Sequence, residues 1–231
     1  MTPITYDLLN RLPKVELHCH LDGCLRPQSM LKVADQDGIS LPFNNVAELD
    51  SFLRIGKKRG TLEDYLKRFD ITLSVMQTPE SLTRFAYELI EDVARENVRY
   101  LEVRYSPILH TKHGMTLEEA VESVLLGLKN GEKDFGVKSG IIVCGIRSIS
   151  PAISLKLADL SVQYKNRGVV GFDLAGAEEN FPAKEHREAF YLIRNNNINA
   201  TIHAGEAYGP ASIHQAIHQC GANRIGHGTR L

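Results

Sequence analysis

The sequence has almost no net charge and no long apolar run. Its formal net charge is -1 over 231 residues, so we expect no basic surface for nucleic acid or an anionic membrane. The longest apolar run, residues 141–146, contains a glycine and is far too short to span a bilayer. The N-terminus carries Pro3, Asp7 and Arg11 and no apolar core segment, so no signal peptide is predicted. We therefore expect a cytoplasmic protein without nucleic-acid or membrane partners.

Cysteine is also scarce. The four cysteines, Cys19, Cys24, Cys144 and Cys220, form no Cys-x-x-Cys pair and are predicted to be buried thiols of a cytoplasmic protein. A hydrophobic content of 43% and a charged content of 24% are those of an ordinary globular protein. The length allows one large α/β domain or two small ones.

Six β-rich segments alternate with helical segments along the chain. The β-rich segments lie near residues 15, 99, 139, 169, 199 and 224. Helical spacing is predicted for residues 27–37, 46–53, 62–69, 79–96, 115–135, 151–165, 183–195 and 210–220. This alternation implies right-handed βαβ units and a parallel sheet, and no linker divides it. Residues 1–231 are therefore predicted to be a single domain.

Unusual polar residues fall where the predicted strands end. His18 and His20 lie on the first strand, Gly176 just past the fourth, His203 at the end of the fifth and His227 at the end of the sixth. In a (β/α)8 barrel the chemistry sits at the C-terminal ends of the strands. A doubly wound open sheet is the competing architecture, but it offers no reason for histidines at these ends. We predict a (β/α)8 TIM-type barrel, here truncated after about six strands.

The segment from Lys14 to Gly23 is predicted to be a strand that ends in a turn. Because side chains alternate along a strand, one face is expected to pack against helices, and it carries Val15, Leu17, Cys19 and Leu21. The other face carries Glu16, His18, His20 and Asp22. Two imidazoles two residues apart on one face can bind one metal ion. A lone His-x-His is as readily explained by two neighbours on a half-exposed strand.

Two residues near the later strand ends add to this pattern. By itself, Glu206 is best explained as a solvated loop acid and His227 as a satisfied core histidine. Beside His203, Glu206 looks like a carboxylate placed for proton transfer. Three histidines around one zinc leave room for a water whose pKa falls toward about 7. The pattern therefore favours hydrolytic chemistry.

Five motifs resemble the adenosine deaminase family in order and spacing over the whole chain. They are Leu17-His18-Cys19-His20-Leu21-Asp22-Gly23, Val103-Arg104-Tyr105-Ser106-Pro107, Asp173-Leu174-Ala175-Gly176, His203-Ala204-Gly205-Glu206 and Arg224-Ile225-Gly226-His227-Gly228. The resemblance implies a zinc-dependent barrel that deaminates adenosine and deoxyadenosine hydrolytically, giving inosine and ammonia from adenosine. It also implies one Zn²⁺ per chain, a purine nucleoside as small-molecule partner and a monomer.

The same resemblance assigns the metal and the proton transfers. It implies that His18, His20 and His203 bind the zinc. Glu206 is expected to donate a proton to the purine ring, and His227 to orient or deprotonate the attacking water.

The resemblance also assigns substrate contacts. Asp22 is expected to hold the ribose, with His20 beside the substrate, and Gly176 to offer its backbone to the purine. Tyr65 and Phe69 resemble the apolar helix that covers the base, and they are nearly as well explained as core residues of that helix.

Two neighbouring families fit less well. Zinc deaminases of the cytidine type combine a His-x-Glu with a Pro-Cys-x-x-Cys, a combination that this chain lacks. Two-metal amidohydrolases share the His-x-His but use a bridging lysine at the fourth strand, where this chain has Leu174-Ala175-Gly176. We therefore expect one metal. Two alternatives stay open: a deaminase of another 6-aminopurine, adenine or an N6-substituted AMP, and a non-catalytic zinc-binding protein.

The chain departs from the family in two places. Ala177 stands where many members have an acid that contributes to substrate contact. The family's fourth zinc ligand, an aspartate after the eighth strand, and the next aspartate, which contacts the purine, lie beyond the end of this sequence. We therefore expect a fragment of a longer deaminase, with a gap in the barrel wall. By itself it should bind zinc more weakly, be poorly soluble and show no turnover.

Overall fold

The strands form one curved parallel sheet. The computed structural model describes residues 4–54, 66 and 68–231. Its six strands follow one another in the order of the sequence, as β1 (Lys14–His20), β2 (Val98–Tyr105), β3 (Lys138–Ile146), β4 (Val169–Ala175), β5 (Asn199–Ala204) and β6 (Arg224–His227). Every neighbouring pair is parallel. The sequential parallel order confirms the predicted α/β barrel wall, with β1 and β6 at its two edges within the described residues.

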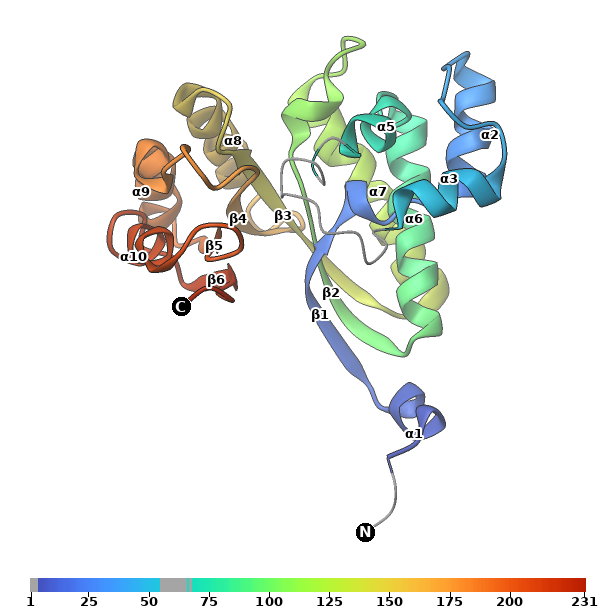
Figure 1. Ribbon diagram of the computed structural model, residues 1–231, viewed down its shortest axis with the longest axis horizontal. Helices are drawn as coiled ribbons and strands as arrows, with labels where there is room; N and C mark the ends of the chain where they lie inside the picture. Colours follow the sequence, from blue (N-terminus) through green and yellow to red (C-terminus); the bar gives the residue numbers. More distant parts are fainter. Residues whose placement is uncertain (1–3, 55–65, 67) are drawn as a thin grey trace.

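The helices lie in two groups (Figure 1). The first group is α2 (Pro27–Asp37), α3 (Val46–Leu53), α5 (Phe69–Ser74), α6 (Pro79–Arg95) and α7 (Leu117–Phe135). The second is α8 (Pro151–Gln163), α9 (Arg187–Asn195) and α10 (Pro210–His218). The remaining helical segments are α1 (Tyr6–Arg11), η1 (Leu21–Gly23), η2 (Pro107–His110) and η3 (Ala183–His186). Helices α6 and α7 pack against β2 and β3, α8 against β3 and β4, and α9 and α10 against β5.

Local signals in the sequence set several of these boundaries. Thr116 caps α7 by accepting the N–H of Glu119 at 3.1 Å, while the Glu119 carboxylate accepts the N–H of Thr116 at 2.8 Å. Helix α2 starts at Pro27 and ends at Gly38, whose φ of 66° suits a glycine. The helix predicted over 183–195 is divided into η3 and α9, and most of the helix predicted over 62–69 lies outside the described residues.

The core lies between the strands and their helices. The strand residues in this core are apolar and fully buried: Leu101, Val103, Ile141, Val143, Phe172, Leu174 and Ile202. Side chains from α6 and α7 complete the first half of this core, and Phe190 from α9 packs against Phe172 at a ring-centroid distance of 5.3 Å. In the described part of the chain, no helix is long and apolar enough to cross a membrane.

The prediction that one face of the first strand is buried is wrong at Val15 and Leu17, although Leu21 is buried. Val15 is 60% exposed and Leu17 is 40% exposed. The strand is an edge of the sheet, and Figure 1 shows it running away from the helices toward α1, so no described helix covers that face. The alternation also ends earlier than predicted, because Leu21 and Asp22 belong to the η1 turn rather than the strand.

The cysteine prediction is half right. Cys144 and Cys220 are buried, but Cys24 is exposed and Cys19 is only half-buried. Cys24 follows η1 at the rim of the site described below, where the packing of the core does not reach.

Candidate metal and catalytic site

The predicted site residues meet at the C-terminal edge of the sheet. A cavity of about 770 Å³ opens there. It is lined by every one of these residues that the structure describes: His18, His20, Asp22, Phe69, Gly176, His203, Glu206 and His227. Tyr65 lies outside the described residues. Parallel strands bring these side chains together because their C-terminal ends all lie on one edge.

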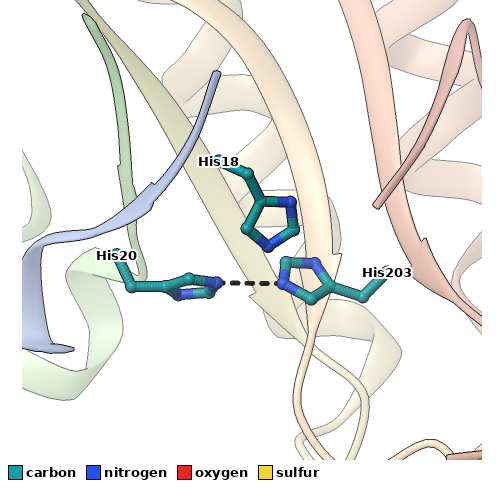
Figure 2. A group of neighbouring side chains, drawn as sticks. All are labelled: His18, His20 and His203. Atoms are coloured by element: carbon teal, nitrogen blue, oxygen red, sulfur yellow. Dashed lines mark hydrogen bonds between the residues drawn. The ribbon is translucent and has the colours of Figure 1, made fainter. Parts of the chain in front are cut away.

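Three of the histidines converge on one point, as Figure 2 shows. One nitrogen from each of His18, His20 and His203 lies within 4.8 Å of the other two. The Nε2 atoms of His20 and His203 are 2.9 Å apart, and the buried Nε2 of His18 has no hydrogen-bond partner among the described residues. Ligand nitrogens around a tetrahedral zinc would be about 3.3 Å apart. The group is therefore compact enough to hold a metal ion.

Two of these histidines, His18 and His20, are held neutral. Burial, with the Arg104 charge nearby, lowers the pKa of His18 to about 3. Burial and the neighbouring His203 lower the pKa of His20 to about 3. A metal binds the neutral imidazole, so both rings are ready to coordinate at neutral pH. Three imidazole nitrogen donors beside an open cavity fit zinc, which uses three protein ligands in catalytic sites and leaves one position open.

A buried ion pair lies directly behind the cluster, and the sequence analysis did not identify it. Asp173 is completely buried, and its Oδ2 accepts a hydrogen bond of 2.6 Å from Arg104. The same oxygen lies 2.9 Å from Nδ1 of His203. Although burial opposes it, the close contacts with His203 and with the Arg104 guanidinium keep the pKa of Asp173 well below its ordinary range. A carboxylate at Nδ1 directs the Nε2 of His203 toward the other two histidines.

A sequence signal for this pair existed. Arg104 and Asp173 both belong to the family motifs, on strands β2 and β4, and a charged residue within an otherwise apolar strand needs a partner. Their pairing over 69 residues of sequence could not be assigned from spacing alone.

Glu206 and His227 face each other across the cavity. His227 Nε2 lies 3.5 Å from a carboxylate oxygen of Glu206. Burial lowers the pKa of His227. Its φ of 69° is unusual for a residue other than glycine, and such strain is common at functional sites. At Gly226, a Cβ atom would lie only 2.9 Å from Cε1 of His18, so the glycine makes room for the ring.

The remaining predicted residues form the other side of the cavity. Asp22 is buried, and its Oδ1 has no hydrogen-bond partner among the described residues. Burial raises the pKa of Asp22 to about 7. Gly176 follows β4 with a φ of 96°, a conformation that favours glycine and leaves its backbone beside the cavity. A buried carboxyl oxygen that has no hydrogen-bond partner among the described residues favours a ligand that brings a hydroxyl group.

The only His-x-Glu of the sequence, residues 186–188, lies elsewhere. His186 is buried behind β3, with Nδ1 at 2.8 Å from Ser154 Oγ and Nε2 at 3.2 Å from the Arg147 carbonyl oxygen. Both ring nitrogens therefore have partners within the protein, and His186 does not line the cavity.

Comparison with known proteins gives a consistent result. The sequence model of the family described as "Adenosine deaminase" matches residues 13–231. An adenosine deaminase from Mycobacterium ulcerans is 45% identical over 233 residues, which cover 98% of this chain and 64% of that protein. The chain thus spans less than two thirds of this relative.

Solved structures of deaminases share the fold. An adenine deaminase from Arthrobacter aurescens is 28% identical with a TM-score of 0.84, covering 94% of this chain and 64% of that one. An amidohydrolase from Burkholderia ambifaria with bound Zn is 27% identical with a TM-score of 0.87, covering 98% and 62%. The N6-mAMP deaminase of Arabidopsis is 27% identical with a TM-score of 0.82, covering 97% and 68%. Together with the family match, the shared barrel and the histidine cluster lead to one assignment: the chain belongs to the adenosine deaminase family.

Proposed function

We propose that the protein hydrolyses adenosine and deoxyadenosine, with inosine and ammonia as the products from adenosine, using one zinc ion held by His18, His20 and His203. The observation that carries this proposal is the convergence of those three imidazoles with Glu206 and His227 in one cavity. Membership of the family and the zinc in the related amidohydrolase support it. A non-catalytic zinc-binding protein would need the three histidines but not the Glu206–His227 pair.

Each residue has a role that its position supports. A zinc ion, when bound, supplies the Lewis acidity that makes water nucleophilic near neutral pH. Glu206 projects into the cavity and donates a proton to a ring nitrogen, so that the carbon bearing the amino group accepts the nucleophile. His227, 3.5 Å away, orients or deprotonates the attacking water. The proton that His227 takes from the water goes to the amino group, which leaves as ammonia. The proton of the added hydroxyl returns to Glu206 as the carbonyl forms.

The substrate contacts come from residues on the other side of the cavity: Asp22, Gly176 and Phe69. Asp22 has an oxygen without a partner and is suited to a ribose hydroxyl. Gly176 offers its backbone to the purine, and Phe69 provides apolar surface in the same cavity. Two related structures, an adenine deaminase and an N6-mAMP deaminase, favour a second candidate: a deaminase of one of those 6-aminopurines.

Turnover measurements separate these candidates. Adenosine, deoxyadenosine, adenine and N6-methyl-AMP are each added to the protein as its gene encodes it, and to the 231-residue chain alone, with zinc supplied. The change in purine absorbance is followed. We expect fastest turnover of adenosine and deoxyadenosine by the gene-encoded protein. A clear preference for adenine or N6-methyl-AMP would support the second candidate, and no turnover of any purine would favour a non-catalytic role.

Glu206→Gln tests the proposed proton donor. The amide has nearly the same shape but cannot deliver the proton, so we expect turnover to fall about 10²–10⁴-fold while zinc content stays at one ion per chain. Metal analysis and initial rates provide the measurement, with Glu188→Gln, an exposed acid on α9, as the control. A Glu206→Gln variant with the activity of the control would remove Glu206 from the mechanism.

A further inference from the structure

We infer that Glu178 is a positioning residue that fixes the loop carrying Glu206. This inference rests on the proposed function, because it gives Glu178 a purpose only if Glu206 transfers a proton. Glu178 follows β4 and is buried, with 5% of its surface exposed. It does not line the cavity, so it cannot touch a substrate there and must act through its neighbours.

The Glu178 carboxylate accepts hydrogen bonds from four consecutive backbone N–H groups. Oε1 accepts the N–H of Gly205 at 2.5 Å. Oε2 accepts the N–H groups of Glu206, Ala207 and Tyr208 at 3.1, 2.7 and 2.8 Å. The loop backbone is therefore curled around a single carboxylate, in the way that successive N–H groups form an anion-binding concavity. The proton donor's own amide is one of the four.

The conformation of the loop depends on this anchor. Gly205 has a φ of 70°, which turns the chain sharply after β5 and aligns the following N–H groups. Burial opposes a charge on Glu178, but the hydrogen bonds that it accepts outweigh burial, so its pKa lies below the ordinary value. The carboxylate is thus ionised at neutral pH, and hydrogen bonds to an ionised acceptor are among the strongest in proteins.

Arg147 binds backbone carbonyl groups next to the same loop. Its guanidinium is buried after β3 and donates to the carbonyl oxygens of His203 at 2.6 Å and Phe181 at 2.7 Å. Arg147 therefore ties the end of β5 to the segment that contains Glu178. With the carbonyl side and the N–H side both held, the backbone positions of His203 and Glu206 are fixed relative to each other.

Amide hydrogen exchange tests the anchor without relying on turnover. Exchange at residues 205–208 is measured in the gene-encoded protein and its variants Glu178→Ala, Glu178→Gln and Glu179→Gln. Glu179 is the exposed neighbouring acid and serves as the matched control. We expect exchange at these four amides to rise about tenfold or more in Glu178→Ala, because the carboxylate that accepts all four hydrogen bonds is lost. Glu178→Gln keeps one carbonyl oxygen and should show a smaller rise.

Steady-state kinetics of the gene-encoded protein test the consequence for Glu206. A misplacement of about 1 Å at a reacting group can cost about 10²-fold in rate. We therefore expect kcat to fall about 10–100-fold in Glu178→Ala, with KM changed less than about threefold and zinc content unchanged. Glu178→Gln should recover part of kcat, and Glu179→Gln should equal the parent.

The two measurements keep the inference separate from the proposed function. Unchanged exchange at 205–208 in Glu178→Ala, or an unchanged kcat in a zinc-loaded variant, would overturn the role of Glu178. A higher KM or a lower zinc content in Glu178→Ala, with kcat unchanged, would also overturn it. Absence of turnover in the parent protein would refute the proposed function, while the exchange result would still decide whether Glu178 anchors the loop.

Discussion

The strand-end site and the paired helices α6 and α7 are built in opposite ways. Behind the site, buried charges such as Arg104 and Asp173 support a histidine cluster in which Nε2 of His18 has no hydrogen-bond partner among the described residues. Between α6 and α7 the contacts are tight and largely apolar: a Cβ atom on Gly127 would lie 2.2 Å from the Thr83 carbonyl oxygen, and one on Gly131 would lie 2.6 Å from Ile90 Cβ.

A hollow alone does not distinguish the two regions. A surface groove of about 900 Å³ lies along α6 and α7, larger than the cavity at the strand ends. It is lined by ordinary surface acids, arginines and lysines and contains no histidine. The difference teaches that unsatisfied buried polar atoms gathered at one place, rather than the volume of a hollow, mark the site. Substitutions at the site should therefore change zinc affinity as well as stability, whereas substitutions between α6 and α7 should change stability alone.

The largest effect on stability is expected from Asp173→Ala. The substitution leaves the buried Arg104 guanidinium without its carboxylate, which should lower the free energy of unfolding by about 3–5 kcal/mol. His203 also loses the group at its Nδ1, so zinc affinity should fall. Urea unfolding of the zinc-free protein and a competitive zinc titration measure the two effects. Asp159→Ala, an exposed acid on α8, is the control, and equal unfolding midpoints for both variants would contradict the prediction.

Gly127→Ala should destabilise the helical layer and leave the site intact. The added methyl group meets a backbone oxygen and Ala86, so α6 and α7 must separate, at about 2–3 kcal/mol of stability. Zinc affinity should stay at the parent value, in contrast to Asp173→Ala. Asn130→Ala, exposed on the same helix, is the control. A Gly127→Ala protein as stable as that control would show that the helices can adjust freely.

The smallest effect comes from pH acting on His110, a buried histidine of the helical region. Burial lowers its pKa to about 4, although Nδ1 lies 2.9 Å from the Met76 carbonyl oxygen. Between pH 4 and 6.5 the unfolded chain binds the proton and the folded chain does not, so stability rises with pH across this window. From pH 7 to 5.5, His110 alone should reduce the free energy of unfolding by about 1 kcal/mol.

Removing the titrating group measures this contribution. Urea unfolding of zinc-free protein at pH 7 and 5.5 should show a pH-dependent loss in His110→Gln that is smaller than in the parent by about 1 kcal/mol. His214→Gln, on an exposed position of α10, should keep the parent's loss. An identical pH dependence in all three proteins would mean that the pKa of His110 is the same in the folded and unfolded states.

Several elements could be predicted because their signals are local. Thr116 and Glu119 form their capping box within one turn, and Pro27 and Gly38 bound their helix through their own backbone preferences. The spacing of His18 and His20 puts both on one face of a strand because side chains alternate. Histidines at the ends of successive strands also predicted a common edge, since parallel strands end together.

The tertiary structure decided what covers each element and which distant groups meet. The exposed face of β1 and the exposed Cys24 were predicted to be buried, because apolar character indicates a preference but not which element covers the surface. Glu178 looked like any other acid in a polar loop, and only the fold brings it within hydrogen-bonding distance of four amides 27–30 residues away. The sequence by itself thus determined secondary structure, strand order and the residues capable of the chemistry. Burial, the Arg104–Asp173 pairing and the Glu178 anchor were decided only by tertiary packing, because each depends on contacts that no local periodicity encodes.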